Sequence, residues 1–413
     1  MPRLLQIDSC LGVLSTGRIT EGIAGVAAEH GWDCYIAHGA RYVGKSKMTS
    51  YQVGTKLGEY LHYAQSLLFD RHGQGSALAT RRLIKKIEKE IKPDIIHLHC
   101  IHGYYLNYKV LFEYLNQTDI PVVWTFHDCW AFTGHCAYFD YVGCEKWKWG
   151  CRSCELTDNY PRSLGIDLSP LNYKQKKYLF SSIKDLIIVP VSDWLKELVG
   201  FSFLNNYTCV TVHNGINLEI FSPDITTNVR NKYVIGTSDI ILGVAAQWDK
   251  RKGLGDFIRL RELLDDSFVI VLVGLSQKQI EDLPAGIIGI KRTDSAGELA
   301  QLYKEALTFV NPTYSDNFPT VNLEALACGT PVITYDTGGS PEAVDEKTGV
   351  VVPQGDVYAL AQAIRSMKEH PLSSEACRQR AEKEFNQENC YMKYLDLYER
   401  LIGKRPVGGG IED

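Results

Sequence analysis

Short apolar runs alternate along the chain with longer segments in which apolar positions recur with helical spacing. Near-continuous apolar runs that alternate with such segments are typical of strands buried in parallel sheets. A first set predicts strands at Arg3–Asp8, Cys34–His38, Asp94–His99, Pro121–Phe126, Leu186–Val191 and Cys209–His213. A second set predicts strands at a run beginning with Ile240 and at Phe268–Gly274, Gly286–Ile290, Leu307–Asn311, Pro331–Tyr335 and Gly349–Val352.

The two sets predict an α/β protein with two doubly wound, Rossmann-like domains that face each other across a cleft, where open α/β sheets bind ligands. The polar segment Asn217–Val234 is the predicted linker, so the domains are expected at residues 1–220 and 221–386. Residues 129–160 are expected to form an insert in the first domain. A last helix, Gln387–Ile402, is expected to pack back on that domain within residues 387–413, and Arg405–Asp413 is expected to be disordered.

Composition and charge narrow the class of protein. The chain has 413 residues, of which 45% are hydrophobic and 23% charged, which excludes a disordered, collagen-like or coiled-coil protein. Its formal net charge of -5 predicts no nucleic-acid partner. No apolar stretch reaches the roughly 18 residues of a membrane span, and Met1–Ser9 does not resemble a signal peptide. The sequence therefore predicts a cytoplasmic protein.

The segment Asn311–Val344 carries the strongest chemical signal. Asp316 lies in the loop after a predicted strand, Pro319 suits the start of a helix, and Glu324 lies within that helix. Carboxylates placed in this way can accept hydrogen bonds from sugar hydroxyls. The following Gly338–Gly339–Ser340 turn lets backbone N–H groups approach a phosphate. The alternative interpretation is a surface helix followed by a glycine turn.

This segment resembles the nucleotide-sugar site of the retaining glycosyltransferases of family GT4, which have the GT-B fold. The helix sequence EALACGTPV and the turn GGSPE carry the resemblance, which extends over nearly the whole chain. It implies that Glu324 binds the donor ribose, and that the loop Asp316, Asn317, Phe318 and Pro319 faces the donor sugar. It also places Gly339 and Ser340 at the donor. Family members carry Glu where this chain has Asp316, which keeps the charge and shortens the reach.

A second part of the resemblance is a pair of cations for the donor diphosphate. Lys252 matches the family lysine, whereas Gln247 stands where the family has arginine. Arg251 can supply the missing charge, because a guanidinium binds phosphate in a fork geometry. The sequence therefore predicts that Lys252 and Arg251 stabilise the leaving diphosphate without a catalytic metal. The alternative is a solvated basic turn.

In the first domain, the family places a glycine loop after the first strand, which implies roles for Gly17 at the donor and Arg18 at the acceptor. His127 ends a predicted strand, and the resemblance implies that it contacts the donor sugar. Asp128 is expected to orient the His127 ring or to bind the acceptor. The dinucleotide fingerprint G-x-G-x-x-G is missing, which argues against a dehydrogenase.

Five of the twelve cysteines fall between Cys129 and Cys154. Cys136, Cys144, Cys151 and Cys154 end in a Cys-x2-Cys pair of the kind found in zinc sites, which predicts a structural zinc. An iron–sulfur cluster, disulfides and free packing thiols remain alternatives. Some bacterial polysaccharide glycosyltransferases carry a similar cysteine-rich insert after an HD-x-W-x-x-TG-x-C segment.

The expected reaction is transfer of a hexose from a UDP- or GDP-linked donor to a glycan with retention, for a capsule, exopolysaccharide or O-antigen. The acceptor is expected to be lipid-linked, and the basic helix Ala77–Lys92 is expected to touch anionic lipid at the inner face of the membrane or to be a solvated face. A GT-B sugar-nucleotide epimerase or hydrolase, and a non-catalytic nucleotide-sugar binding protein, are the alternatives.

Overall fold

A computed structural model describes residues 1–403, and the chain divides into two compact units. The N-terminal unit contains Met1–His213 and the segment that begins at Glu388; the C-terminal unit is Asn214–Gln387. The predicted linker belongs to the C-terminal unit, because Arg378 donates hydrogen bonds to the carbonyls of Leu218 (3.2 Å) and Phe221 (2.8 Å). Residues 404–413, including the predicted disordered tail, lie outside the described residues.

The N-terminal unit is built on a parallel sheet of seven strands in the order β3-β2-β1-β4-β5-β6-β7. The strands are β1 Arg3–Leu11, β2 Asp33–Val43, β3 Thr49–Gln52, β4 Ile95–Leu98, β5 Val122–Phe126, β6 Leu186–Pro190 and β7 Thr208–Cys209. The apolar runs predicted β1, β2, β4, β5 and β6 but not β3, whose residues are mostly exposed at the edge of the sheet. The last prediction, Cys209–His213, overlaps β7 at Cys209 alone. The strand order reverses between β1 and β4, which is where ligands bind in sheets of this kind.

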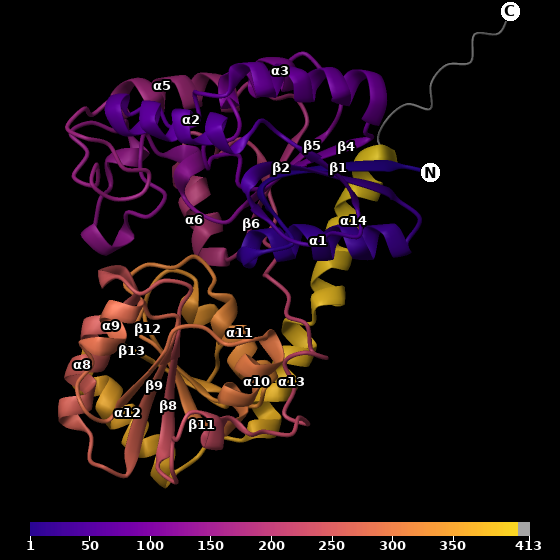
Figure 1. Ribbon diagram of the computed structural model, residues 1–413. Coiled ribbons are helices and arrows are strands. Elements are labelled where there is room, and N and C mark those ends of the chain that lie inside the picture. Colours follow the sequence, from indigo (N-terminus) through magenta and orange to yellow (C-terminus); the bar gives the residue numbers. More distant parts are fainter. Residues whose placement is uncertain (404–413) are drawn as a thin grey trace, which may run out of the picture. The chain divides into compact units, whose positions relative to one another are not determined.

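Helices cover both faces of this sheet. The two helices α1 (Leu14–Glu29) and α14 (Gln387–Gly403) share one core, in which Trp32 and Tyr398 pack with ring centroids 5.5 Å apart. Figure 1 shows α14, in yellow, among the elements of the N-terminal unit. The remaining helices are α2 Lys56–Phe69, α3 Ala77–Lys86 with the π-turn Ile87–Ile91, α4 Tyr108–Leu115, α5 Ser169–Phe180 and α6 Asp193–Phe201.

The connection between β1 and α1 differs from its prediction. Residues Ser15–Ile19 were expected to form a glycine loop, but α1 begins at Leu14. The tight turn instead uses Gly12, whose φ of +61° lies in the left-handed region that favours glycine. Gly17 therefore lies inside the helix, where a Cβ atom would come within 3.0 Å of the Cys10 Cβ. This glycine is needed for close packing of the helix on the strand.

The C-terminal unit contains a parallel sheet of six strands in the order β10-β9-β8-β11-β12-β13. Its strands are β8 Asp239–Val244, β9 Phe268–Val273, β10 Ile287–Ile290, β11 Ala306–Asn311, β12 Val332–Tyr335 and β13 Gly349–Val352. Its helices are α7 Val229–Lys232, α8 Leu254–Leu263, α9 Gln277–Glu281, α10 Ala296–Glu305, α11 Thr320–Ala327, α12 Val357–Glu369 and α13 Ser374–Glu384. The order reverses between β8 and β11. None of the helices described in residues 1–403 is both long and apolar enough to cross a bilayer.

Candidate functional site

Two predicted donor-site residues meet at the switch point of the second sheet. Lys252 lies in the turn after β8, and Asp316 lies in the loop after the neighbouring strand β11. Their side chains form an ion pair and are both mostly buried. Because the loops belong to adjacent strands, a ligand at this edge of the sheet would meet the ammonium and the carboxylate together.

The turn that carries Lys252 is a single 3-10 turn, Lys250–Lys252. Asp249 begins it by accepting a hydrogen bond from the Lys252 N–H at 3.0 Å. Arg251 donates from Nη1 to the carbonyl of Ser315 at 2.7 Å, which ties this turn to the loop after β11. Gln247, which occupies the family's arginine position, is exposed. The binding of phosphate by Arg251 stays a prediction. In the structure, its guanidinium holds the loop that contains Asp316.

Glu324 lies in α11 with only 7% of its surface exposed. Pro319, which was expected at the first helical position, instead precedes the helix as its N-cap. The buried hydroxyl of Tyr303 donates to Glu324 Oε2 at 2.9 Å, so this carboxylate is fixed before any ligand arrives. A fixed carboxylate can accept a ribose hydroxyl with little loss of side-chain entropy.

The rest of the predicted donor loop is closely packed. Asn317, Phe318 and Pro319 are buried, and the Phe318 carbonyl accepts a hydrogen bond from Asn214 Nδ2 at 3.2 Å. Gly338 has a φ of +56°, and a Cβ atom there would lie 1.9 Å from the Asp316 carbonyl oxygen. The glycine turn is therefore required for the backbone around Asp316.

The side chain of Ser340 is bonded within the protein, and its predicted place at the donor stays a prediction. Ser340 is fully buried, and its hydroxyl lies 2.6 Å from the Thr334 hydroxyl and accepts a hydrogen bond from Asn322 Nδ2 at 2.9 Å. The adjacent Gly339 N–H donates to the Asp316 carbonyl at 3.3 Å. These bonds join the turn to α11 and to the loop after β11, so they hold the turn in place.

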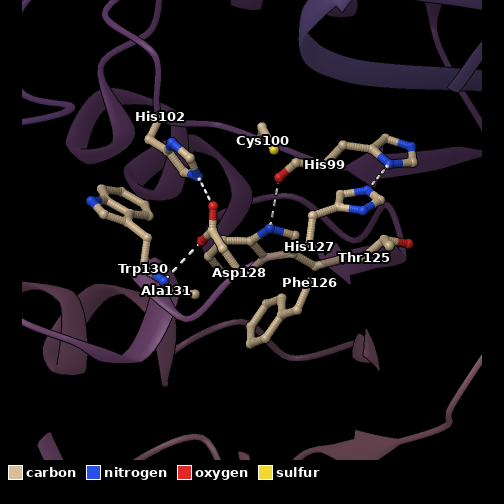
Figure 2. A pocket seen from close by; sticks show the side chains of 10 residues that line it. His99, Cys100, His102, Thr125, Phe126, His127, Asp128, Trp130 and Ala131 are labelled. Atoms are coloured by element: carbon tan, nitrogen blue, oxygen red, sulfur yellow. Dashed lines mark hydrogen bonds and ion pairs between the residues drawn. The ribbon is translucent and has the colours of Figure 1, made fainter. Parts of the chain in front are cut away.

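In the N-terminal unit, a small cavity lies at the carboxyl ends of β4 and β5 (Figure 2). His127 follows β5 and lines this cavity, and its predicted contact with the donor sugar stays a prediction. Its Nε2 lies 3.2 Å from Nδ1 of His99. Burial lowers the pKa of His127 to about 4, so its ring is neutral at physiological pH. Arg18, by contrast, is an exposed residue of α1.

Asp128 is bonded to His102. Its Oδ2 lies 2.9 Å from His102 Nε2, and its Oδ1 accepts the Trp130 N–H at 2.9 Å. Nδ1 of His102 lies 2.9 Å from the Tyr160 hydroxyl. Although Asp128 is buried, the charge of His102 and these hydrogen bonds lower its pKa below the usual 3.8. The pair offers a carboxylate–imidazole couple for binding an acceptor hydroxyl.

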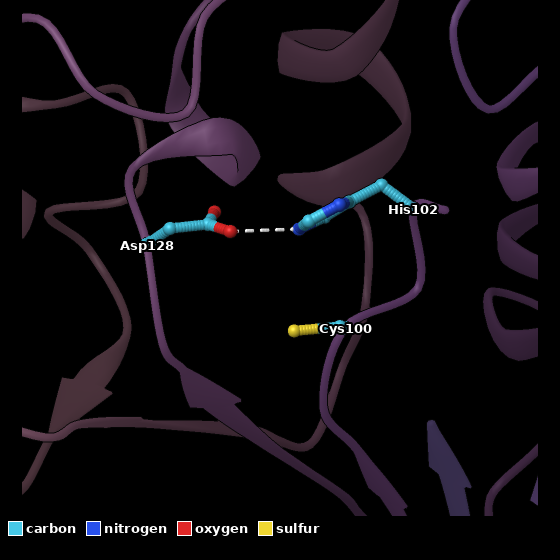
Figure 3. Close-up of side chains that lie close together, drawn as sticks. All are labelled: Cys100, His102 and Asp128. Carbon is cyan, nitrogen blue, oxygen red and sulfur yellow. Dashed lines mark ion pairs between the residues drawn. The ribbon is translucent and has the colours of Figure 1, made fainter. Parts of the chain in front are cut away.

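Cys100 completes a group of metal-type ligands beside this couple (Figure 3). Its sulfur, His102 and Asp128 place their ligand atoms within 4.8 Å of one another, a span that one metal ion could bridge. Burial and the nearby Asp8 and Asp128 carboxylates raise the pKa of the Cys100 thiol well above 9. A thiol that keeps its proton is a poor ligand, and His102 uses both ring nitrogens on protein groups.

Sequence reasoning missed His99, His102 and Tyr160. The sequence did contain a signal for this site. Histidines 97, 99 and 102 lie in and just after a buried parallel strand, where imidazoles are unusual. The partner of His102 is Tyr160, which lies 58 residues later in the chain, within the cysteine-rich insert. No local sequence pattern predicts that contact.

Two family descriptions match the chain. "Glycosyltransferase Family 4" matches residues 20–220, and "Glycosyl transferases group 1" matches residues 225–384. The chain belongs to the family 4 glycosyltransferases. Its two parallel, doubly wound sheets are those of the GT-B fold, so the predicted family and fold class are both confirmed.

This glycosyltransferase is 26% identical over 343 residues to a protein of Escherichia coli K12, "Putative colanic acid biosynthesis glycosyl transferase WcaC", with 77% of this chain and 79% of WcaC aligned. Sucrose-phosphate synthase from Thermosynechococcus elongatus has a similar structure, with a TM-score of 0.75 at 18% identity, over 98% of this chain and all of that one. HepE from Anabaena, solved with UDP and glucose, has a TM-score of 0.66 at 13% identity, over 97% and 99% of the two chains. At these identities the structural likeness shows the fold.

The cysteine-rich insert of this glycosyltransferase has no strand among its described residues and only three short 3-10 turns. The four predicted zinc ligands are free thiols, and Cys136 shares a hydrogen bond with Cys154 that lowers the Cys154 pKa to about 7. Cys151 accepts a hydrogen bond from the Gly134 N–H at 3.1 Å. No three of these four sulfurs, all within the described residues, lie within 4.8 Å of one another. Cysteine sulfurs are ligands that zinc prefers, but these four would have to move closer together to bind one ion.

Other contacts already hold the insert. The rings of Phe132, Phe139 and Trp147 form a buried cluster with centroid distances of 5.1–6.3 Å. His135 Nδ1 lies 2.5 Å from Asp70 Oδ1 in a buried hydrogen bond. Aromatic packing and this contact therefore hold part of the insert without a metal.

Proposed function

We propose that this glycosyltransferase moves a hexose from a UDP- or GDP-linked donor to a growing glycan during synthesis of a cell-surface polysaccharide, with retention at the anomeric carbon. The observation that carries the proposal is the Lys252–Asp316 ion pair at the switch point of the second sheet, together with the fixed carboxylate of Glu324 in α11, the helix that follows the Asp316 loop. WcaC, whose name refers to colanic acid biosynthesis, supports a polysaccharide product, and HepE with UDP and glucose supports a UDP-sugar.

The proposed chemistry is electrostatic. Negative charge grows on the diphosphate as the sugar leaves, and Lys252 is the cation placed to stabilise it, with Arg251 as the second candidate. A diphosphate that binds Lys252 competes with Asp316, which leaves that carboxylate available to a sugar hydroxyl. Glu324 holds the ribose. The chemistry then needs no catalytic metal, because fixed cations and backbone N–H groups supply the countercharge.

The N-terminal unit supplies the acceptor groups in this proposal. His127 contacts the donor sugar, and the Asp128–His102 couple accepts and orients a hydroxyl of the acceptor glycan. In a front-face reaction the departing phosphate oxygen takes the proton of that hydroxyl, so retention requires no protein nucleophile.

The test is a panel of UDP- and GDP-hexoses, each incubated with glycan and lipid-linked acceptors and followed by mass spectrometry and by NMR of the anomeric proton. Transfer with the donor's anomeric configuration supports the proposal. An inverted product contradicts retention. An epimerised or hydrolysed donor favours the sugar-nucleotide epimerase or hydrolase, and binding without turnover favours the non-catalytic protein. The variant Lys252→Ala should slow transfer strongly, whereas Lys250→Ala, at an exposed lysine of the same turn, should not.

We also propose that the acceptor is lipid-linked and that the enzyme binds the inner face of the membrane, and two exposed helix faces of the N-terminal unit support this proposal. Helix α2 exposes Leu57, Tyr60, Leu61 and Leu68 at helical spacing. Helix α3 exposes Arg81, Arg82 and Lys85, and Lys89 follows on the π-turn. Apolar and basic helix faces together bind anionic bilayers.

The membrane proposal is tested by sedimentation with phosphatidylglycerol or phosphatidylcholine vesicles. The double variant Arg81→Glu and Lys85→Glu should lose binding to the anionic vesicles. The control Lys184→Glu, at a surface lysine paired with Asp119, should keep it. Equal binding of all three proteins, or binding of none, would contradict the proposal.

A further inference from the structure

The cysteine-rich insert, residues 129–160, contacts the Asp128–His102 couple through its last residue. The hydroxyl of Tyr160 lies 2.9 Å from Nδ1 of His102, and Nε2 of the same ring lies 2.9 Å from Oδ2 of Asp128. Figure 3 shows the second of these contacts. His102 follows β4 and Asp128 follows β5, whereas Tyr160 belongs to the insert. The imidazole is therefore held at both nitrogens, once from the end of a strand and once from the insert.

The hydroxyl of Tyr160 points into the protein, although the residue as a whole is 41% exposed. Its two polar partners are buried: Nδ1 of His102 and, at the longer distance of 3.5 Å, Nε2 of His72. The ring packs edge-on against the rings of His72 and Tyr104, with centroids 5.4 and 6.3 Å away. These ring contacts define where the hydroxyl lies.

One buried carboxylate holds both ends of the segment 135–168, which contains Tyr160. Asp70 follows the last residue of α2. Its Oδ1 lies 2.5 Å from Nδ1 of His135, and its Oδ2 accepts the backbone N–H of Leu168 at 2.7 Å. Because both ends of the segment are bonded to the same side chain, the fold of the insert keeps Tyr160 against His102.

A hydroxyl is well suited to this position. The charge of His102 and hydrogen bonds keep the pKa of Asp128 below 3.8 despite its burial, so this carboxylate is ionised at neutral pH and can only accept. His102 therefore donates to it from Nε2. A hydroxyl can donate to a bare Nδ1 and accept from a protonated one. Tyr160 can thus hold the imidazole in one orientation in both of its charge states.

We propose that Tyr160 is a positioning residue through which the cysteine-rich insert holds the Asp128–His102 couple in place for a hydroxyl of the acceptor glycan. The inference rests on the proposed function for the acceptor role of the couple, and on the fold alone for the contact. It gives the insert a task on the acceptor side of the reaction. Loss of the Tyr160 hydroxyl should therefore alter the use of the acceptor and leave the donor site in the C-terminal unit unaffected.

The variant Tyr160→Phe removes the hydroxyl and keeps the ring. We expect the KM for the best acceptor of the panel to rise about tenfold, the effect of one lost hydrogen bond, while kcat and UDP affinity stay unchanged. The control Tyr207→Phe removes a hydroxyl of the same unit that bonds the carbonyls of Phe180 and Ile183 at 3.0 and 3.1 Å, and it should change none of these constants. An unchanged acceptor KM in Tyr160→Phe, or an equal loss of UDP affinity, would overturn the inference.

A double-mutant cycle shows whether Tyr160 acts through His102. His102→Phe removes the imidazole, so the addition of Tyr160→Phe should cause no further rise in the acceptor KM. Effects of the two substitutions that multiply would mean that Tyr160 acts on its own, which contradicts a positioning role.

The contact itself is measured on the full-length protein without ligands. In long-range proton–nitrogen spectra of protein labelled with 15N-histidine, His102→Phe assigns the signals of the ring. Tyr160→Phe should shift the His102 nitrogens, and Tyr207→Phe should not. Unshifted His102 signals in Tyr160→Phe would overturn the inference, whether or not any sugar is transferred. If the wild-type protein transfers no sugar, the proposed function fails, and these spectra alone decide whether the insert holds His102.

Discussion

Lys252 and Asp316 form an ion pair between the loops that follow β8 and β11. The pair links a cation suited to a diphosphate with a carboxylate suited to a sugar. We predict that Lys252→Ala lowers kcat/KM roughly a hundredfold, because removing one preorganised electrostatic group typically costs about that much. Initial rates with the best donor of the panel measure the effect, and Lys250→Ala is the matched control. Equal rates for the two variants would mean that another cation stabilises the leaving group.

Asp316 itself provides a second test of this site. We predict that Asp316→Asn lowers turnover strongly, since the amide removes the charge and leaves the packing intact. Asp316→Glu, which introduces the residue that the family usually has here, should keep most of the activity. Steady-state kinetics of both variants test this prediction. Full activity of Asp316→Asn would show that the charge serves only to hold Lys252 in place.

Glu324 is held by the Tyr303 hydroxyl at 2.9 Å. We predict that Glu324→Ala weakens donor binding about tenfold, because each lost hydrogen bond to ribose is worth about 1 kcal/mol or more. Tyr303→Phe should weaken binding less, since the carboxylate remains and only its orientation loosens. Titration calorimetry with the nucleoside diphosphate gives both numbers, and an unchanged affinity in Glu324→Ala would remove this residue from the donor site.

The sequence predicted the strands well because each buried parallel strand is an apolar run. It missed Thr49–Gln52, since an exposed edge strand buries little and leaves no such pattern. The positions of Lys252, Asp316 and Glu324 were predictable from the family resemblance and from local spacing at the ends of strands, and their roles stay predictions. The structure adds that the first two are in contact.

The contact between Gln6 and His99, which in turn contacts His127, could not be predicted from local spacing. Gln6 and His99 are separated by 93 residues, and nothing near either one indicates the other. Their contact depends on β1 lying next to β4, which is a property of the strand order. Gly17 lies inside a helix because Gly12 makes the turn before it. The sequence alone does not show which of these two glycines makes the turn.

Buried histidines give stability a predictable pH dependence. Burial lowers the pKa values of His97 and His99 well below 6.5. Below about pH 6.5 the unfolded chain binds protons that the folded protein does not, so the free energy of unfolding falls as the pH falls, by about 1.4 kcal/mol per unit for each such histidine. Asp8 acts in the opposite sense, since burial raises its pKa to about 6 and the folded protein binds the extra proton. At low pH the destabilisation from the two histidines is larger than the stabilisation from the one aspartate.

We therefore predict that the protein is less stable at pH 5 than at pH 7.5 in urea denaturation. His97→Phe should reduce this difference, because one neutral buried imidazole is gone. His370→Gln, at an exposed histidine, should leave it unchanged. Stability that is constant or increases toward pH 5 would contradict the assignment of neutral buried rings.

The cysteine-rich insert provides the last prediction. The Cys136–Cys154 hydrogen bond keeps Cys154 close to the thiolate form, and the Gly134 N–H already points to Cys151, so the donors suit a thiophilic ion. We predict about one zinc per chain in protein purified without chelator. Four cysteines leave no open position, so the metal would be structural, and its removal should lower activity without affecting donor binding. Cys136→Ser and Cys154→Ser should lose the metal, whereas Cys209→Ser, outside the insert, should keep it. Elemental analysis distinguishes zinc from iron, and thiol titration distinguishes free cysteines from disulfides. Metal-free protein with twelve titratable thiols would leave aromatic packing and the His135–Asp70 hydrogen bond as what holds the insert together.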